Sequence, residues 1–435
     1  MCTMFTLLKN HLTTSRFKLF GFIRGLKCLV FLVSILFCHP AIASEKSADL
    51  LALQDRIIRL VPNGCVQLNN ETGQTLFSYR TEDLLIPASL IKILTALVAF
   101  EELGIEYRFK TEFYVNDRGD LAIKGWGDPF LISEEIDLIT SALVAKGLRK
   151  VNRLYLDTTS FQKNIRISGL SNSQNPYDAL NGALVVNFNS LFIGRNQQGN
   201  IYSAEAVTPL TPLALIKGQH LKPGEEERFN LTIQADESLQ YVGELFLAKF
   251  NNRSIQVKDP KIGEIAINGS WRLLYAHFNS HDLTSIVDGL LRYSNNYIAN
   301  QIFLAIGLHR GQPPANLEKS RHVFRRYLNE KYGQSISGTV VDEASGISKL
   351  NRMSCGTLMK FLEDFRKHAS LIQLKKGIRV KSGTLTGIYN YAGYFQSNQG
   401  LQPFVIMSEN RRNNRDRALE LLNRYIKIQQ RLDSD

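Results

Sequence analysis

Residues 87–96 read Pro-Ala-Ser-Leu-Ile-Lys-Ile-Leu-Thr-Ala, and this apolar stretch contains a serine and a lysine three residues apart. Apolar residues recur at helical spacing from 88 to 103, and Pro87 stands just before them, a favoured position for proline. We therefore expect a buried helix over 88–103. In that helix Ser89 and Lys92 are three residues apart and face the same side, so the amine can reach the hydroxyl.

This pair predicts a serine nucleophile with a lysine base. A serine hydroxyl is a poor nucleophile until a base removes its proton. Lys92 can act as that base only when neutral, and burial or a nearby positive charge such as Lys381 lowers a lysine pKa. The start of the helix favours a developing negative charge, and the Ser89 N–H can be one donor to an oxyanion.

A second string, Ser294-Asn295-Asn296, lies between two helical stretches. The Ser294 hydroxyl can relay a proton to a leaving amine. The Asn296 amide can hold both a substrate backbone and the catalytic lysine. Tyr293 and Asn295 offer an alternative register for the same motif, which we consider less favoured than Ser294 and Asn296.

A third string, Lys381-Ser382-Gly383-Thr384, begins an expected strand. Lys381 offers positive charge, and the hydroxyls of Ser382 and Thr384 can bind a terminal carboxylate. Gly383 lets a substrate lie close to the strand, and the Thr384 N–H would be the second oxyanion donor.

Each string alone is weak evidence. S-x-x-K also occurs at Ser15 and Lys18 and at Ser160 and Lys163. The order of the three strings, with the first on an apolar helix and the last before a pair of strands, favours one shared site.

The first 43 residues are typical of a secretory signal peptide. Residues 1–27 contain five basic side chains and no acidic one, an apolar run follows at 28–38, and Ala41-Ile42-Ala43 matches a cleavage site. The apolar run is shorter than the roughly 20 residues of a membrane-spanning helix. We expect an exported, periplasmic protein cleaved after Ala43.

Only Cys65 and Cys355 remain after that cleavage, so the mature protein is not a disulfide scaffold. The sequence does not decide whether these two cysteines pair. Their positions, in an expected strand and in the first turn of a distant helix, favour unpaired thiols.

The pattern predicts an α/β (α+β) protein with an insertion. Strand-like runs such as 109–115, 183–193, 229–234 and 244–250 crowd the middle of the chain, with one helix at 133–146. Helical periods return after 282, followed by strands at 390–396 and 403–407 and a final helix at 416–432. We predict a signal peptide (1–43), a first domain part (44–107), a β-rich insert (108–275) and a second domain part (276–435).

Removing the leader takes away five of the twelve net positive charges, so the mature protein is still basic. This charge suits a polyanionic neighbour such as a cell-wall polymer or membrane surface, or simply a solvated basic surface. The final helix shares this basic character, with Arg415, Arg417, Arg424, Lys427 and Arg431. It can cover the adjacent strands, which we favour, or make a peripheral membrane-surface contact.

The sequence gives little support to nucleic-acid binding or to a metal site. There is no nucleic-acid module and no cysteine cluster. His277 and His281 have zinc-like spacing, but Phe278 stands where a metalloprotease motif has glutamate. We expect no metal and no cofactor.

The three strings in their context resemble the class C low-molecular-mass penicillin-binding proteins, which are serine D-alanyl-D-alanine carboxypeptidases and endopeptidases of the bacterial cell wall. Residues 87–96, 127–129, 156–157, 294–296, 342–348 and 381–387 are similar to that family's landmarks. The resemblance implies a transpeptidase-like domain, an antiparallel sheet covered by helices, with an insert. It also implies an acyl-enzyme on Ser89, with peptidoglycan stem peptides and β-lactams as partners.

Some positions depart from the family pattern. Asn295 replaces an aspartate, Ser382 replaces a threonine, and the stretch 367–381 is shorter than in relatives. The short stretch keeps open a catalytically weak peptidoglycan-binding protein of the same fold. A β-lactamase is the other alternative, although no deacylating glutamate is identified.

Overall fold

The structure is a computed structural model that describes residues 48–432. The expected signal peptide lies outside these residues. The described chain divides into two compact units, residues 48–60 with 416–432 and residues 61–415. Among the helices of residues 48–432, none has the length and apolar character needed to cross a bilayer.

The smaller unit is helical. It contains a helix at 48–60 and nearly all of α10 (Arg415–Leu432). The Gln54 Nε2 donates a hydrogen bond to the Tyr425 hydroxyl at 3.1 Å, which links the two helices. The final helix is therefore present where the sequence predicts it.

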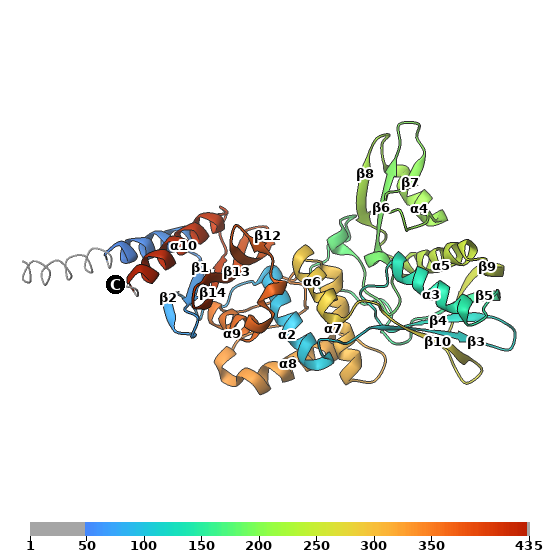
Figure 1. The fold of residues 1–435 in the computed structure, drawn as a ribbon, viewed down its shortest axis with the longest axis horizontal. Helices are drawn as coiled ribbons and strands as arrows, with labels where there is room; N and C mark the ends of the chain where they lie inside the picture. Colours follow the sequence, from blue (N-terminus) through green and yellow to red (C-terminus); the bar gives the residue numbers. More distant parts are fainter. Residues whose placement is uncertain (1–47, 433–435) are drawn as a thin grey trace, which may run out of the picture. The chain divides into compact units, whose positions relative to one another are not determined.

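An antiparallel six-stranded sheet organises the larger unit (Figure 1). Its strand order is β11-β12-β13-β14-β1-β2, so β1, from early in the chain, pairs with β14, from its end. The strands are β1 (Gly64–Asn69), β2 (Thr75–Tyr79), β11 (Leu374–Lys375), β12 (Ile378–Leu385), β13 (Ile388–Ser397) and β14 (Gly400–Ser408). The strands just before the first string in the chain and the strands around the third string therefore belong to one sheet.

A helical layer packs against this sheet. Helix α2 (Ile91–Leu103) is apolar on nearly all sides and is buried along most of its length, as expected for a helix surrounded by other elements. It contacts α6, α7 and α9, and α9 covers β1, β13 and β14. The other helices of this layer are α6 (Leu283–Tyr293), α7 (Asn296–Arg310), α8 (Leu317–Tyr332) and α9 (Cys355–Phe365), with the 3-10 turns η1 (Ala88–Leu90), η5 (Gly333–Ile336) and η6 (Arg366–Leu371).

The chain between α2 and α6 forms a second, mixed sheet with order β10-β3-β4-β5-β9, and a small sheet with order β7-β6-β8. Its strands are β3 (Lys110–Val115), β4 (Leu121–Gly125), β5 (Lys150–Asp157), β6 (Ser190–Arg195), β7 (Ile201–Ser203), β8 (Glu226–Asn230), β9 (Gln256–Glu264) and β10 (Arg272–Phe278). Its helices are α3 (Ser133–Ala145), α4 (Pro212–Lys217) and α5 (Ala235–Asn252), with η2 (Pro176–Asp178), η3 (Asn187–Asn189) and η4 (Gly218–His220). This region has its own apolar core.

One predicted strand in this region is wrong. Residues 244–250 belong to α5, whose buried residues Val242, Leu245, Phe246 and Phe250 recur at helical spacing. The helical period of these apolar residues is evident only over the whole of α5, because the shorter segment 244–250 alone also fits a strand. The segment 183–193 is also only partly strand, because η3 interrupts it and β6 begins at Ser190.

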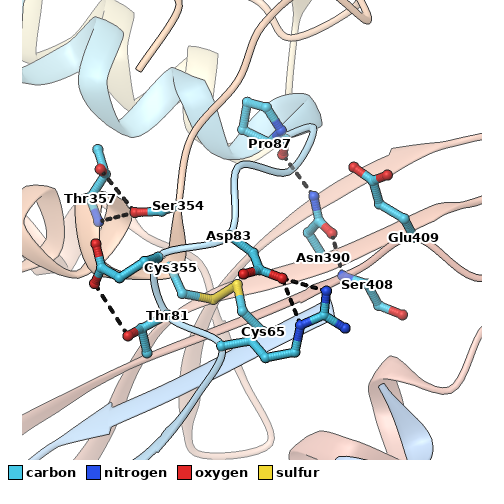
Figure 2. Close-up of a disulfide and its surroundings, with 12 residues drawn as sticks. Cys65, Thr81, Asp83, Pro87, Ser354, Cys355, Thr357, Asn390, Ser408 and Glu409 are labelled. Carbon is cyan, nitrogen blue, oxygen red and sulfur yellow. Dashed lines mark hydrogen bonds and ion pairs between the residues drawn. A yellow bond between two sulfur atoms is a disulfide. The ribbon is translucent and has the colours of Figure 1, made fainter. Parts of the chain in front are cut away.

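The preference for unpaired cysteines is also wrong. Cys65 on β1 and Cys355 at the start of α9 form a disulfide with Cα atoms 6.1 Å apart (Figure 2). The two residues are 290 positions apart in sequence. Because α9 packs directly on β1, folding brings the two thiols to bonding distance.

Candidate active site

Ser89 lies in the tight turn η1 that leads directly into α2. Ala88, just before it, has a φ of +47°, a backbone conformation that residues other than glycine rarely adopt. Asn390 on β13 holds this turn, because its Nδ2 donates to the carbonyl oxygen of Ile86 at 2.9 Å. The same Nδ2 donates to the carbonyl oxygen of Pro87 at 3.0 Å (Figure 2). The strained turn therefore depends on the neighbouring sheet for its shape.

Two glycines allow the surrounding chain to approach this turn closely. A Cβ atom on Gly346 would lie 1.9 Å from the Ala88 carbonyl oxygen. A Cβ atom on Gly383 would lie 2.7 Å from the Pro87 carbonyl oxygen. The glycine of the third string thus brings β12 against the serine turn.

Lys92 is fully buried, and its Nζ has three neighbours. It lies 3.0 Å from the Ser89 Oγ, 2.8 Å from the Asn296 Oδ1 and 2.5 Å from the Ser345 carbonyl oxygen. Burial lowers the pKa of Lys92 well below its ordinary value, and the positive charge of Lys381 lowers it further.

The partners of this amine determine where its lone pair points. A neutral lysine has two N–H groups and one lone pair. The Asn296 Oδ1 and the Ser345 carbonyl oxygen can only accept hydrogen bonds, so they take the two N–H groups. The lone pair is then left for the Ser89 hydroxyl, which can donate its proton.

The loop 342–348 supplies the Ser345 carbonyl, and a buried carboxylate shapes this loop. Glu343 is fully buried. It accepts hydrogen bonds from the N–H groups of Ser345 and Gly346, at 2.7 and 2.6 Å, and from the side chains of Asn300 and Asn351 at 2.9 and 2.8 Å. A carboxylate that receives this many hydrogen bonds fixes the turn whose carbonyl meets Lys92.

A second hydrogen-bonded pair joins the other two strings. Lys381 Nζ donates to the Ser294 Oγ at 2.7 Å and to the Ser382 carbonyl oxygen at 3.0 Å. Burial lowers the pKa of Lys381 to about 7, with further contributions from the positive charges of Lys375 and Arg415. Ser294 itself ends α6 in the left-handed conformation, which turns the chain toward α7.

The two adjacent asparagines have different contacts. The Asn295 side chain caps α7 by accepting from the Ile298 N–H at 3.0 Å. The Asn296 side chain instead contacts Lys92 through Oδ1, and its Nδ2 donates to the Tyr177 carbonyl oxygen at 3.3 Å. Tyr293 is 77 % exposed. These contacts favour the Ser294/Asn296 register over Tyr293/Asn295.

The structure therefore brings together residues from all three strings. Ser89, Lys92 and Asn296 form one hydrogen-bonded group, and Ser294 and Lys381 form another. Ser382, Gly383 and Thr384 follow Lys381 on β12, and Thr384 is exposed.

Sequence reasoning missed some residues at this site. The Ser345 carbonyl and the Tyr177 carbonyl are backbone groups, which carry no sequence signal. Arg415 was assigned to the basic face of the final helix, but its Nη1 donates to the Thr384 Oγ1 at 2.5 Å. A contact between residues this far apart in sequence leaves no local pattern in the amino-acid sequence.

His277 contacts a buried acidic side chain. Its Nε2 lies 2.7 Å from a carboxylate oxygen of Glu135, and both side chains are buried. Within residues 48–432, no group of three or more His, Cys, Asp or Glu residues is arranged to hold a metal ion.

Comparison with known proteins identifies relatives along most of the chain. The sequence model of the D-Ala-D-Ala carboxypeptidase 3 (S13) family matches residues 52–217 and 213–376. D-alanyl-D-alanine carboxypeptidase DacB of Haemophilus influenzae is 22 % identical over 440 residues, which covers 85 % of this chain and 89 % of that protein. A D-alanyl-D-alanine carboxypeptidase of an Actinomadura species is 23 % identical, with 86 % and 84 % covered.

A solved structure shares the fold. The crystal structure of penicillin binding protein 4 (dacB) from Haemophilus influenzae matches with a TM-score of 0.64 at 19 % identity. The match covers 82 % of this chain and 93 % of that one. It confirms the predicted fold class, a mixed α/β protein with an antiparallel sheet and covering helices.

Proposed function

The chain belongs to the D-Ala-D-Ala carboxypeptidase 3 (S13) family, and on this basis we propose that it is a serine-type D-alanyl-D-alanine carboxypeptidase and endopeptidase. Its substrates are peptidoglycan stem peptides, and the reaction passes through an acyl-enzyme on Ser89. β-Lactams acylate the same serine.

One observation carries this proposal, the buried amine of Lys92 beside the Ser89 hydroxyl. Its two N–H groups have acceptors in Asn296 and Ser345, and its pKa is far below that of an ordinary lysine. These contacts support a neutral base that is already aimed at the nucleophile.

Acylation begins when the Lys92 amine takes the proton of the Ser89 hydroxyl. The Ser89 Oγ then attacks the carbonyl carbon of the scissile D-Ala amide. The carbonyl oxygen becomes an oxyanion, for which the N–H groups of Ser89 and Thr384 are the donors.

Collapse of this intermediate needs a proton on the leaving amine. The Ser294 hydroxyl, held by Lys381, relays the proton that Lys92 took from Ser89 to the leaving nitrogen as the C–N bond breaks, which returns Lys92 to its neutral form. Water then hydrolyses the ester on Ser89 and regenerates the hydroxyl. The charge of Lys381 and the hydroxyls of Ser382 and Thr384 bind the carboxylate of the substrate.

We also propose that the protein is exported to the periplasm, with cleavage after Ala43. The disulfide between Cys65 and Cys355 supports an oxidising compartment. For the domains, we propose that the segment to 107 and the segment from 276 form the transpeptidase-like part, interrupted by the insert 108–275. The shared sheet of β1, β2 and β11–β14 supports this division.

The proposal is tested by covalent labelling of the mature protein with fluorescent penicillin and by release of D-Ala from a pentapeptide. We expect Ser89→Ala to abolish both. Ser270→Ala, which changes an exposed serine, is the matched control and should label at the wild-type rate. Labelling retained in Ser89→Ala would show that the nucleophile is assigned wrongly.

The same assays separate the two alternatives. A peptidase releases D-Ala and hydrolyses nitrocefin slowly, whereas a β-lactamase turns nitrocefin over rapidly. A protein that only binds peptidoglycan gives neither a covalent adduct nor D-Ala.

A further inference from the structure

Arg415, the first residue of α10, lies beside the third string rather than on a solvated basic face. Its Nη1 donates to the Thr384 Oγ1 at 2.5 Å and to the Gly383 carbonyl oxygen at 3.4 Å. Its guanidinium carbon lies 4.6 Å from the centre of the Tyr391 ring on the neighbouring strand β13. These contacts fix a half-buried guanidinium against β12 and β13.

Among the described residues, the partners of this guanidinium are neutral. Its hydrogen bonds go to a hydroxyl and a backbone carbonyl, and within residues 48–432 no carboxylate forms an ion pair with it. Its Nε is buried without a hydrogen-bond partner. The positive charge of this half-buried guanidinium is therefore not balanced by a carboxylate of the described residues, and an anion that binds beside the guanidinium would balance it.

The residues around Arg415 face the same side of the sheet. Ser382 and Thr384 are two positions apart on β12, so their side chains point to one face. Tyr391 is the strand partner of Ser382 and shares that face. The Thr384 oxygen accepts from Arg415, which leaves its own O–H free to donate to another group.

We propose that Arg415 is a specificity-determining residue that binds the carboxylate of the substrate together with Thr384. The carboxylate meant here is the one on the residue that leaves, adjacent to the scissile nitrogen. This inference rests on the proposed function and deepens it, because it names the chemical feature that the site selects.

The arrangement defines the class of substrate. A terminal D-Ala carries a free carboxylate next to the scissile nitrogen, and so does a cross-link whose acceptor residue has a free α-carboxylate. Both kinds of peptide present the same charge to Arg415. Peptides amidated at this carboxylate lose that partner and should react slowly.

The charge requirement is tested by acylation of the mature protein with benzylpenicillin and with its methyl ester, followed by intact-mass spectrometry. For Arg415→Gln we expect the rate with benzylpenicillin to fall roughly 10–100-fold, the size of a lost hydrogen bond to a charged group. The rate with the methyl ester should stay within about twofold of wild type, because the ester offers no charge to bind. Arg415→Lys should lie between the two, since it keeps the charge but loses the planar fork.

Arg411→Gln removes an exposed arginine nearby and is the matched control, expected to leave both rates unchanged. An equal loss for the acid and the ester in Arg415→Gln would mean that Arg415 only supports the shape of β12, and would overturn the proposal. Wild-type rates with both compounds in Arg415→Gln would also overturn it. If Arg415→Gln does not fold, the acid-to-ester ratio of Arg415→Lys decides, and an unchanged ratio contradicts the proposal.

Failure of the proposed function itself gives a different result. The wild-type protein would then form no adduct with either compound, or Ser89→Ala would still form one. Either outcome removes the acyl-enzyme, and with it the basis for a role of Arg415 in selecting its substrate.

Discussion

The motif S-x-x-K occurs twice in the described chain, and the two copies have different surroundings. In the first copy, Lys92 is fully buried and contacts Ser89 and two uncharged acceptors. In the second, Lys163 is exposed and pairs with the carboxylate of Glu264 at 3.1 Å. The Ser160 hydroxyl of that copy donates to the Gly125 carbonyl oxygen at 2.5 Å instead of meeting its lysine.

The difference shows that the surroundings, and not the four-residue pattern, decide whether the lysine amine meets the serine hydroxyl. The exposed Lys163 amine pairs with a carboxylate, and the Ser160 hydroxyl donates elsewhere, so this copy does not join its amine to its serine. A buried lysine near a second positive charge loses its proton more readily. The same letters therefore place a buried amine beside a serine hydroxyl in one copy and form a surface ion pair in the other.

The largest expected effect comes from exchanging the two lysines for methionine. Lys92→Met should slow acylation by fluorescent penicillin roughly 10²–10⁴-fold, because it removes the proposed general base. Lys163→Met should label at the wild-type rate. Equal losses in both variants would mean that the two copies do not differ in the way described, and circular dichroism would check that each variant folds.

A smaller effect is expected at Asn296, which accepts one N–H of Lys92. Asn296→Ala should lower the acylation rate roughly 10–100-fold, because the lysine loses an acceptor that orients its lone pair. The rate is measured at several pH values with fluorescent penicillin. A rate like that of wild type at every pH would show that Asn296 does not orient the base.

Burial of Lys381 should make the stability depend on pH. Its pKa falls to about 7 in the folded protein, mainly through burial, so the unfolded chain binds this proton more tightly. The free energy of unfolding should therefore rise with pH between about 7 and about 10, the pKa of an unperturbed lysine.

Urea unfolding at pH 7 and pH 9 measures this dependence. The increase should be larger in wild type than in Lys381→Met by about 2 kcal/mol. Lys163→Met should behave like wild type because its lysine is exposed. An identical increase in wild type and Lys381→Met would show that Lys381 keeps its ordinary pKa.

The smallest effect is expected at the neighbouring asparagine. Asn295→Ala removes the cap of α7 and should lower the free energy of unfolding by about 1 kcal/mol. Acylation should stay within about twofold of wild type, since a cap lost without unfolding leaves Lys92 in place. A strong loss of acylation in Asn295→Ala, with Asn296→Ala unaffected, would favour the alternative register.

Local patterns along the chain predicted much of the fold. The apolar period of 88–103 predicted the helical segment formed by η1 and α2, and the helical periods expected after 282 and the final helix at 416–432 were also found. The strand 244–250 was wrong, because several large apolar residues in a short window fit either period. The disulfide was missed because its cysteines meet only after β1 and α9 have packed.

The residue types of the three strings, their order and the apolar helix around Ser89 were already enough to predict a serine nucleophile, a lysine base and a family. Only the folded chain decided which acceptors surround Lys92, how far its pKa falls and where Arg415 lies. Those properties depend on burial and on contacts between residues more than a hundred positions apart. Spacing along a sequence cannot encode them, because a pKa and a hydrogen bond respond to neighbours in space.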